Sequence, residues 1–122
     1  MPAGEGRILV VEDDASLREI IAEALDEDGY AVASAANGAT ALEMARRSPP
    51  DLAIVDLMMP HMGGEQFCSA LREVEGLASL PIIVVSAART TTEVGSRVGA
   101  IAALRKPFDL YELTQRVNSA LS

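Results

Sequence analysis

The feature that most constrains the fold of this chain is a set of five short apolar runs, separated by spacers long enough to hold helices. The runs are continuously apolar and do not alternate with polar residues, which is typical of strands covered by helices on both faces. Parallel pairing needs crossovers of about a dozen residues or more, and the spacers provide them. We therefore predict five strands, at Ile8–Val11, Ala31–Ala35, Leu52–Val55, Ile82–Val85 and, more weakly, Ile101–Leu104.

The spacers carry helix signals of different strength. The first is the clearest, because its apolar residues recur on one face of a helix. The fourth, over residues 90–100, has three consecutive threonines and a central glycine, so its helix should be short and marginal. Gly29 should end the first helix, and the second should begin at the cap Asn37 and end before Pro49–Pro50. The third helix is expected over Gly64–Glu75, and Asp109 with Glu112 should form a capping-box-like start of the last. The alternation of strands and helices indicates an α/β fold.

Length, charge and composition exclude several classes of protein. A chain of 122 residues has the length of one domain, so we expect a single domain over residues 1–122 with a flexible N-terminus at residues 1–6. The net charge of −8 would repel a nucleic acid backbone. No apolar run approaches the roughly 20 residues of a membrane-spanning helix, and no signal peptide pattern begins the chain, so we expect a cytoplasmic location. The single cysteine, Cys68, is expected in the core.

Polar residues follow the carboxyl ends of four of the predicted strands. They are Glu12, Asp13 and Asp14 after the first, Asp56 after the third, Ser86 after the fourth, and Arg105 and Lys106 after the fifth; the small Ala87 follows Ser86, and Pro107 follows Lys106. Parallel strands end at the same edge of a sheet, where α/β proteins bind ligands, so these residues should converge. Two like charges about 4 Å apart cost about 4 kcal/mol at an effective dielectric near 20, so the acids need a partner that neutralises them.

The chemistry of these residues fits phosphoryl transfer assisted by a metal. Carboxylate oxygens suit a hard cation such as Mg²⁺, which accepts one or two protein carboxylates together with phosphate oxygens. Lys106 offers a positive charge for a phosphate, and the Ser86 hydroxyl can donate to a phosphoryl oxygen. Asp56 stands alone at the central strand and is placed to act as a carboxylate nucleophile. Asp14 is more suited to cap the first helix.

Four motifs in the same order, "ILVVEDD", "DLAIVDLMMPHMGG", "PIIVVSA" and "LRKPF", together resemble the CheY-like response regulator receiver domain of two-component signalling. The resemblance covers nearly the whole chain. It implies a doubly wound, five-stranded parallel sheet of flavodoxin-like order 2-1-3-4-5, with helices on both faces. It also implies a cis peptide bond between Lys106 and Pro107.

The resemblance implies a role for each residue of the predicted site. Asp56 would be the phosphoacceptor, and Mg²⁺ would be held by Asp13, by Asp56, by the Met58 backbone carbonyl and, through water, by Glu12. Ser86 would be the switch hydroxyl, Ala87 the small residue that admits the phosphoryl group, and Lys106 the lysine that pairs with the acid or the phosphate. The chain departs from the family at Ala103, where receivers commonly carry a tyrosine or phenylalanine.

The predicted function is a phosphorylation-dependent signalling switch and not an enzyme with outside substrates. It would catalyse only its own Mg²⁺-dependent phosphotransfer and autodephosphorylation. Its partners would be a sensor histidine kinase or a histidine phosphotransfer protein and an unknown downstream protein or output domain, as a stand-alone receiver or as part of a longer protein. Two alternatives are a pseudo-receiver that binds partners without phosphorylation and a metal-dependent phosphohydrolase. A pseudo-receiver should have lost Asp56, Asp13 or Lys106, and all three are present. A phosphohydrolase should carry a second acid or base near Asp56, and the sequence shows none. His61, on the loop after the third strand, is expected to be exposed.

Overall fold

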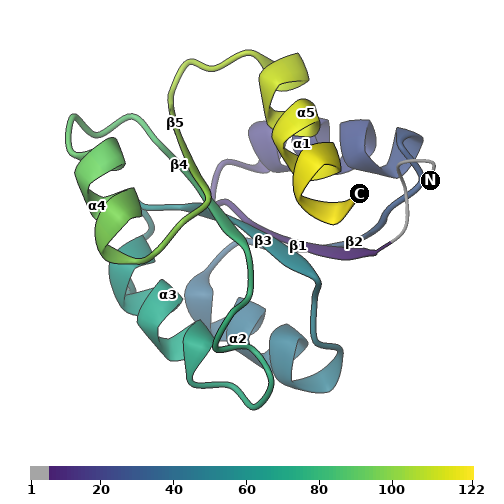
Figure 1. The fold of residues 1–122 in the computed structure, drawn as a ribbon. Helices are drawn as coiled ribbons and strands as arrows, with labels where there is room; N and C mark the ends of the chain where they lie inside the picture. Colours follow the sequence, from purple (N-terminus) through teal and green to yellow (C-terminus); the bar gives the residue numbers. More distant parts are fainter. Residues whose placement is uncertain (1–5) are drawn as a thin grey trace.

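A parallel sheet of five strands forms the middle layer of the protein, which the computed structural model describes over residues 6–122 (Figure 1). Its order is β2-β1-β3-β4-β5, which confirms the predicted order. The strands are β1 (Arg7–Val11), β2 (Ala31–Ala35), β3 (Leu52–Asp56), β4 (Ile82–Ser86) and β5 (Ala102–Arg105). The last strand lies one residue later than predicted, because the ladder continues until Arg105 pairs with Ser86.

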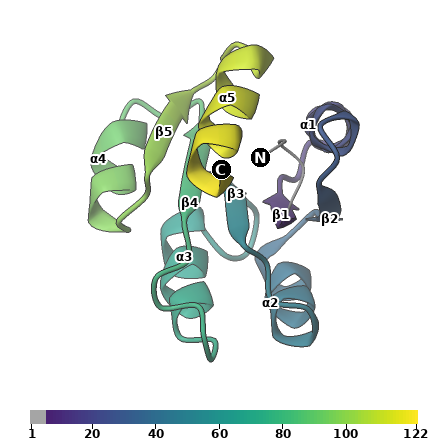
Figure 2. The same cartoon turned by 45° about the vertical axis from the view of Figure 1, so that its right-hand side comes forward.

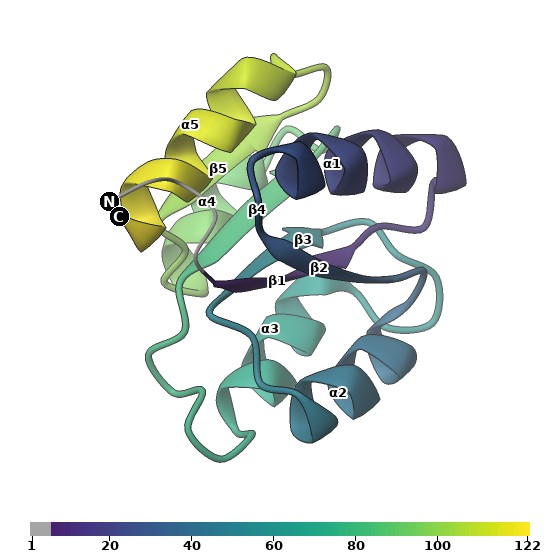
Figure 3. The same cartoon turned by 90° about the vertical axis from the view of Figure 1, so that its right-hand side faces the viewer.

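Five helices cover the two faces of the sheet. They are α1 (Ala15–Glu27), α2 (Gly38–Arg47), α3 (Gly64–Arg72), α4 (Thr91–Arg97) and α5 (Leu110–Leu121). Helices α1 and α5 lie side by side on one face, and α2, α3 and α4 lie on the other (Figures 2 and 3). The fold is therefore the three-layer α/β arrangement that the alternation of strands and helices predicts.

Side-chain caps fix the starts of three helices where the sequence predicts them. The Asp14 carboxylate accepts hydrogen bonds from the backbone N–H groups of Ser16 and Leu17, at 3.0 and 3.2 Å. Asn37 caps α2 and Asp109 caps α5 in the same way. These caps satisfy N–H groups that have no partner inside the helix. Glu112 does not complete the capping box predicted at α5, because its carboxylate pairs with Arg116, 3.7 Å away, and not with the backbone N–H of Asp109.

Helix α3 ends at Arg72, three residues before the predicted end at Glu75. The chain continues in a tighter turn, in which the N–H groups of Glu73 and Val74 bond to the carbonyls of Ala70 and Leu71. Val74 still packs against the core, so the apolar pattern continues beyond the last helical residue and could not show where the helix ends. Helix α4 has seven residues and is short, as predicted.

The core has two parts, one on each face of the sheet. Every residue of β3 and β4 is buried, as expected for central strands between two helical layers. Cys68 is buried in the part that α2 and α3 cover, and burial raises its pKa to about 11. Of the N-terminus expected to be flexible, residues 1–5 lie outside the described residues. Among residues 6–122 no helix is both long and apolar enough to cross a membrane.

Candidate functional site

The register of the sheet brings the predicted polar residues to one edge. Val11 lies opposite Val55, so the residues after β1 lie beside Asp56 at the end of β3. Asp56 in turn lies opposite Val85, and Ser86 lies opposite Arg105. Residues far apart in the sequence therefore converge at the carboxyl ends of four strands, where open α/β sheets bind ligands.

Three carboxylates gather at this edge. One oxygen from each of Glu12, Asp13 and Asp56 lies within 4.8 Å of the others. Glu12 and Asp56 are buried, at 1% and 3% exposure, whereas Asp13 is exposed. Oxygen atoms in this arrangement suit a hard divalent cation that keeps some of its water. The cluster could therefore hold a metal ion.

Lys106 joins the two buried acids. Its Nζ lies 2.9 Å from Glu12 Oε1 and 3.2 Å from Asp56 Oδ2. The contact with Glu12 is an ion pair without the alignment of a hydrogen bond, so Glu12 Oε1 is a buried oxygen that has no hydrogen-bond donor. A buried oxygen without a donor is suited to accept a hydrogen bond from a metal-bound water or to coordinate the metal itself. The sequence predicted a lysine that pairs with an acid, but not that one lysine joins two.

Burial changes the proton affinity of this ion pair. Desolvation raises the pKa of Glu12 to about 7, although Lys106 acts in the opposite direction, and the neighbouring carboxylate of Asp56 also raises it. Burial alone would lower the pKa of Lys106, but the carboxylates of Glu12 and Asp56 raise it above its ordinary value. The lysine therefore stays charged at neutral pH, and Glu12 is the acid that changes its charge there.

The loop after β3 holds Asp56 in place through its backbone. The N–H of Met58 donates to Asp56 Oδ1 at 3.0 Å, while the side chain of Met58 is exposed. The first turn of α3 approaches this loop so closely that a Cβ on Gly64 would lie 2.5 Å from Leu57 Cα and 2.8 Å from the Asp56 carbonyl oxygen. Sequence reasoning did not single out Gly64, and the pair of glycines after His61 was the available signal.

The ends of β4 and β5 complete the site. Ser86 is buried, and its Oγ accepts a hydrogen bond from the N–H of Ala88 at 3.1 Å. Its carbonyl accepts from the backbone N–H of Lys106 at 2.8 Å, which ties the two strand ends together. The peptide bond between Lys106 and Pro107 is cis, as the resemblance implied. Ala87 is exposed and presents only a methyl group at this edge.

Two polar residues of the predicted motifs have other places. Asp14 caps α1 and lies outside the group of three carboxylates, as expected. His61 is exposed, also as expected, and has a positive φ of 69°. A residue that sequence reasoning missed is Arg18, which donates from α1 to the Glu12 carbonyl at 2.8 Å. This bond fixes the backbone next to the acids from the side of the helix.

Comparisons with known proteins agree with this geometry. A family model described as the response regulator receiver domain matches residues 8–118. The chain is 42% identical to the alkaline phosphatase synthesis transcriptional regulatory protein SphR of Synechococcus elongatus, over 94% of this chain and 48% of that protein. It is 40% identical to the response regulator MprA of Mycobacterium leprae, over 94% of this chain and 50% of that protein. The chain thus spans about half the length of these curated relatives.

Solved structures show the same fold. The chemotaxis protein CheY4 of Vibrio cholerae has a TM-score of 0.86 and 31% identity, with 93% of this chain and 97% of that chain covered. The response regulator TrrA of Thermotoga maritima, solved in complex with Mg²⁺-BeF, has a TM-score of 0.81 and 31% identity, over 93% of this chain and 97% of that one. The chain belongs to the receiver-domain family of two-component response regulators, whose general function is phosphorylation-dependent signalling.

Proposed function

We propose that Asp56 accepts a phosphoryl group from a sensor histidine kinase or a histidine phosphotransfer protein, with Mg²⁺ in the acid cluster. The observation that carries this proposal is the place of Asp56, buried at the end of the central strand, within 4.8 Å of two other carboxylates and 3.2 Å from Lys106 Nζ. A carboxylate oxygen of Asp56 would attack phosphorus, the bond from phosphorus to the donor nitrogen would break, and the donor imidazole would keep the electron pair.

The surrounding residues would stabilise the added charge. Asp13, Asp56 and the Met58 carbonyl would hold Mg²⁺, and Glu12 would do so through water; the ion would neutralise charge on the phosphoryl oxygens. Lys106 already contacts Asp56 and would pair with the phosphoryl group. The Ser86 hydroxyl would turn toward the phosphoryl oxygens, and the methyl side chain of Ala87 would leave room for them. The same residues would support the later hydrolysis, so the domain would act only on itself.

A groove beside Lys106 is our candidate for the place where the phosphodonor approaches. It has a volume of about 440 Å³, and its apolar part includes Ile20, which is 51% exposed. Exposed apolar residues around a reactive group are suited to partner binding. The residues that line the groove are Asp14, Ser16, Leu17, Ile20, Lys106, Pro107, Phe108 and Leu110.

A cytoplasmic location, where kinases and transcriptional regulators act, is part of the same proposal. So is a single receiver domain over residues 1–122.

The experiment is mass spectrometry of the intact protein after incubation with a small phosphodonor and Mg²⁺. The protein should gain one phosphoryl group, and Asp56→Asn should gain none. Asp51→Asn is the matched control, because Asp51 precedes the other end of β3 and accepts a hydrogen bond from the Arg7 N–H. Phosphorylation of Asp56→Asn to the same extent as the unaltered protein would refute the assignment of the acceptor.

A further inference from the structure

Strand β2 forms one edge of the sheet and lacks the features that usually keep an edge from pairing. Within residues 6–122 no strand pairs with its outer side, which Figure 3 shows in front, with α1 above and α2 below. Its sequence is Ala-Val-Ala-Ser-Ala, without a charged residue or a proline. Native edges are commonly protected by such residues, and the opposite edge strand, β5, ends in Arg105 and continues into Lys106 and Pro107.

The hydrogen bonds to β1 show which backbone groups of β2 point outward. The N–H of Ala31 donates to the Gly6 carbonyl, and the carbonyl of Ala35 accepts from the Glu12 N–H. These two residues therefore turn their backbone groups toward β1. Because successive residues of a strand alternate, Val32 and Ser34 turn their N–H and carbonyl groups toward the outer side. An added strand would therefore pair with Val32 and Ser34.

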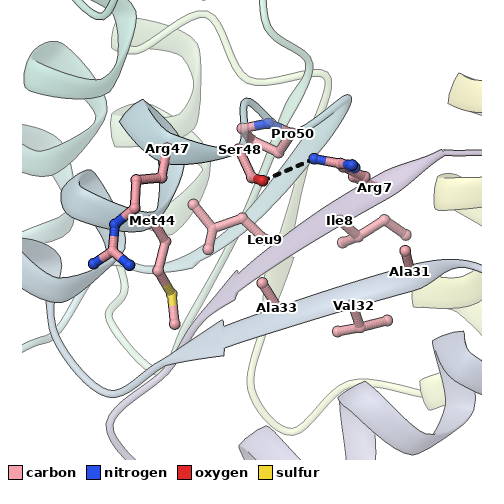
Figure 4. Close-up of a pocket in the computed structure, with 10 residues that line it drawn as sticks. All are labelled: Arg7, Ile8, Leu9, Ala31, Val32, Ala33, Met44, Arg47, Ser48 and Pro50. Atoms are coloured by element: carbon pink, nitrogen blue, oxygen red, sulfur yellow. Dashed lines mark hydrogen bonds between the residues drawn. The ribbon is translucent and has the colours of Figure 1, made fainter.

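An apolar groove borders this edge on the α2 side (Figure 4). It has a volume of about 420 Å³. Leu9 and the small side chain of Ala33 lie at its base and Met44 of α2 forms part of its wall, so it is open where larger residues on β2 would fill it. The side chains of Arg7 and Arg47 lie on opposite sides of the groove in this view, and the Arg7 guanidinium donates to Ser48 Oγ at 2.9 Å. Apolar contact is therefore combined with positive charge on this side of β2.

The α1 side of the same edge has the opposite charge. A second hollow, of about 420 Å³, is lined by Glu19, Glu23 and Asp26 of α1 and by Val32 of β2. Val32 also lines the first groove, so the two hollows flank one strand. The side chains of an added strand would point alternately to these two sides. Each side would select a different kind of residue.

We propose that β2 receives an extended segment of a partner protein as a sixth strand. Toward α2 this segment presents acidic residues around an apolar one, which enters the groove between Arg7 and Arg47. Toward α1 it presents basic residues, which meet Glu19, Glu23 and Asp26. Main-chain hydrogen bonds to Val32 and Ser34 hold the segment, and the alternating charges select it. A second copy of this chain does not fit as well, because its own β2 carries no charged residue.

The test uses two peptides of identical composition and the ¹⁵N-labelled full chain. Acetyl-Glu-Lys-Leu-Lys-Glu-amide should shift the amide resonances of Val32 and Ser34 in a saturable way. Acetyl-Lys-Glu-Leu-Glu-Lys-amide should bind about tenfold more weakly, because four charge pairs are reversed. A shift of this second peptide by one residue restores the charges but moves its leucine out of the apolar groove. Equal binding of both peptides, or no saturable shift with either at millimolar concentration, would overturn the proposal.

Matched variants of the protein separate the site from general charge effects. Arg47→Glu should weaken binding of the first peptide several-fold, whereas Arg46→Glu, which changes the net charge equally on a residue outside the groove, should leave it unchanged. On α1, Glu23→Lys should also weaken binding several-fold, whereas Glu27→Lys, outside the second hollow, should leave it unchanged. Equal effects within either pair would overturn the charge selection. Resonance shifts of Val32 that follow protein concentration alone, with a dimer in sedimentation, would show that a second copy occupies the edge and would overturn it too.

The proposal does not depend on phosphoryl transfer. Residues that line the two hollows lie on β1, β2, α1 and α2 and in the loop after α2, and none of them belongs to the acid cluster. Asp56→Asn should therefore bind the first peptide as the unaltered protein does. A loss of binding in Asp56→Asn would contradict the independence of the two sites, while a failure of both peptides would leave the phosphoacceptor assignment untouched.

Discussion

Glu12 is the buried acid whose charge is most open to change near neutral pH. Its pKa is raised from 4.5 to about 7 by burial, so between these values the folded chain keeps a proton that the unfolded chain has released. Stability falls with rising pH wherever the folded state binds more protons. We therefore expect the melting temperature of the metal-free protein to decrease as the pH rises from about 4.5 to 7, measured by thermal unfolding in the presence of a chelator.

The matched variant for this prediction is Glu12→Gln, which keeps the shape of the side chain and removes its titration. The decrease over the same pH range should become smaller, because the proton that the folded chain retains on Glu12 is then no longer present to be lost. The pair with Lys106 does not obscure the comparison, since the pKa of Lys106 is raised and its loss of charge lies well above this range. Identical pH profiles for the two proteins would show that Glu12 is not the source of the slope.

Gly64 is the residue at which a single methyl group should disturb the site most directly. A Cβ at this position would lie 2.5 Å from Leu57 Cα and 2.8 Å from the Asp56 carbonyl oxygen, and backbone atoms cannot rotate away. Gly64→Ala should lower the free energy of unfolding by about 1–3 kcal/mol, the usual cost of overpacking. Chemical denaturation measures this value.

Gly63→Ala is the control for Gly64→Ala. Gly63 has a φ of −64°, which any residue adopts, and no atom within 4 Å of an added Cβ. Its substitution should cost about 1 kcal/mol or less, the loss expected when alanine replaces glycine at an N-cap without a steric clash. Equal costs at the two positions would contradict the steric explanation and would point to a loss of backbone freedom at both.

At the scale of elements, the strands could be predicted because continuous apolar runs and helix-length spacers leave few arrangements. The caps at Asp14, Asn37 and Asp109 could be predicted from residue type and position alone. The end of α3 could not, because the tight turn after Arg72 keeps Val74 on the apolar face. The contacts of Arg18 with Glu12 and of Gly64 with Leu57 also could not, since they depend on how closely a helix approaches a loop in three dimensions.

Helix α4 shows how the family pattern is altered at Ala103. A Cβ on Gly95 would lie 3.0 Å from Ala103 Cβ and 3.1 Å from Val84 Cγ2, so the helix packs closely on the part of the sheet where receivers commonly carry an aromatic ring. The methyl group of Ala103 has no rotamer to change. The buried Thr91 lies next to Ser86 on this side, because its hydroxyl donates to the Ala88 carbonyl at 2.5 Å and lies 3.4 Å from the Ser86 carbonyl. We therefore expect any coupling from Ser86 to this face to act through the backbone of residues 86–88 and through Thr91.

We predict that phosphorylation orders residues 87–98. The segment is short and contains three threonines and a glycine, so its local stability should be low and easily changed. Amide hydrogen exchange with Mg²⁺, with and without a stable phosphoryl mimic, should show protection gained across this segment. Helix α2, which α3 separates from α4 in Figure 1 and which carries none of the site residues, is the internal reference. Equal protection of residues 87–98 in both states would contradict the prediction.

At the scale of the whole molecule, acidic residues outnumber basic ones by 18 to 10, and the net charge is −8. Folding brings three of these acids to one edge, where their oxygens lie within 4.8 Å, and supplies a single lysine that joins two of them. The unfolded chain has no comparable cluster. A divalent cation that binds the folded protein and not the unfolded chain must therefore stabilise the fold by linkage.

We expect millimolar Mg²⁺ to raise the free energy of unfolding by several tenths to a few kcal/mol, an amount set by the ratio of ion concentration to dissociation constant. Asp13 is the exposed member of the three carboxylates, so Asp13→Ala should remove most of the effect. Asp26→Ala removes an equal charge from α1, outside the cluster, and should retain it. Thermal unfolding of the three proteins with and without Mg²⁺ is the measurement. A melting temperature indifferent to Mg²⁺ would exclude a metal site at these carboxylates. A Mg²⁺ effect that survives Asp13→Ala would exclude it too, because the gain in stability would then come from general screening of the acidic surface.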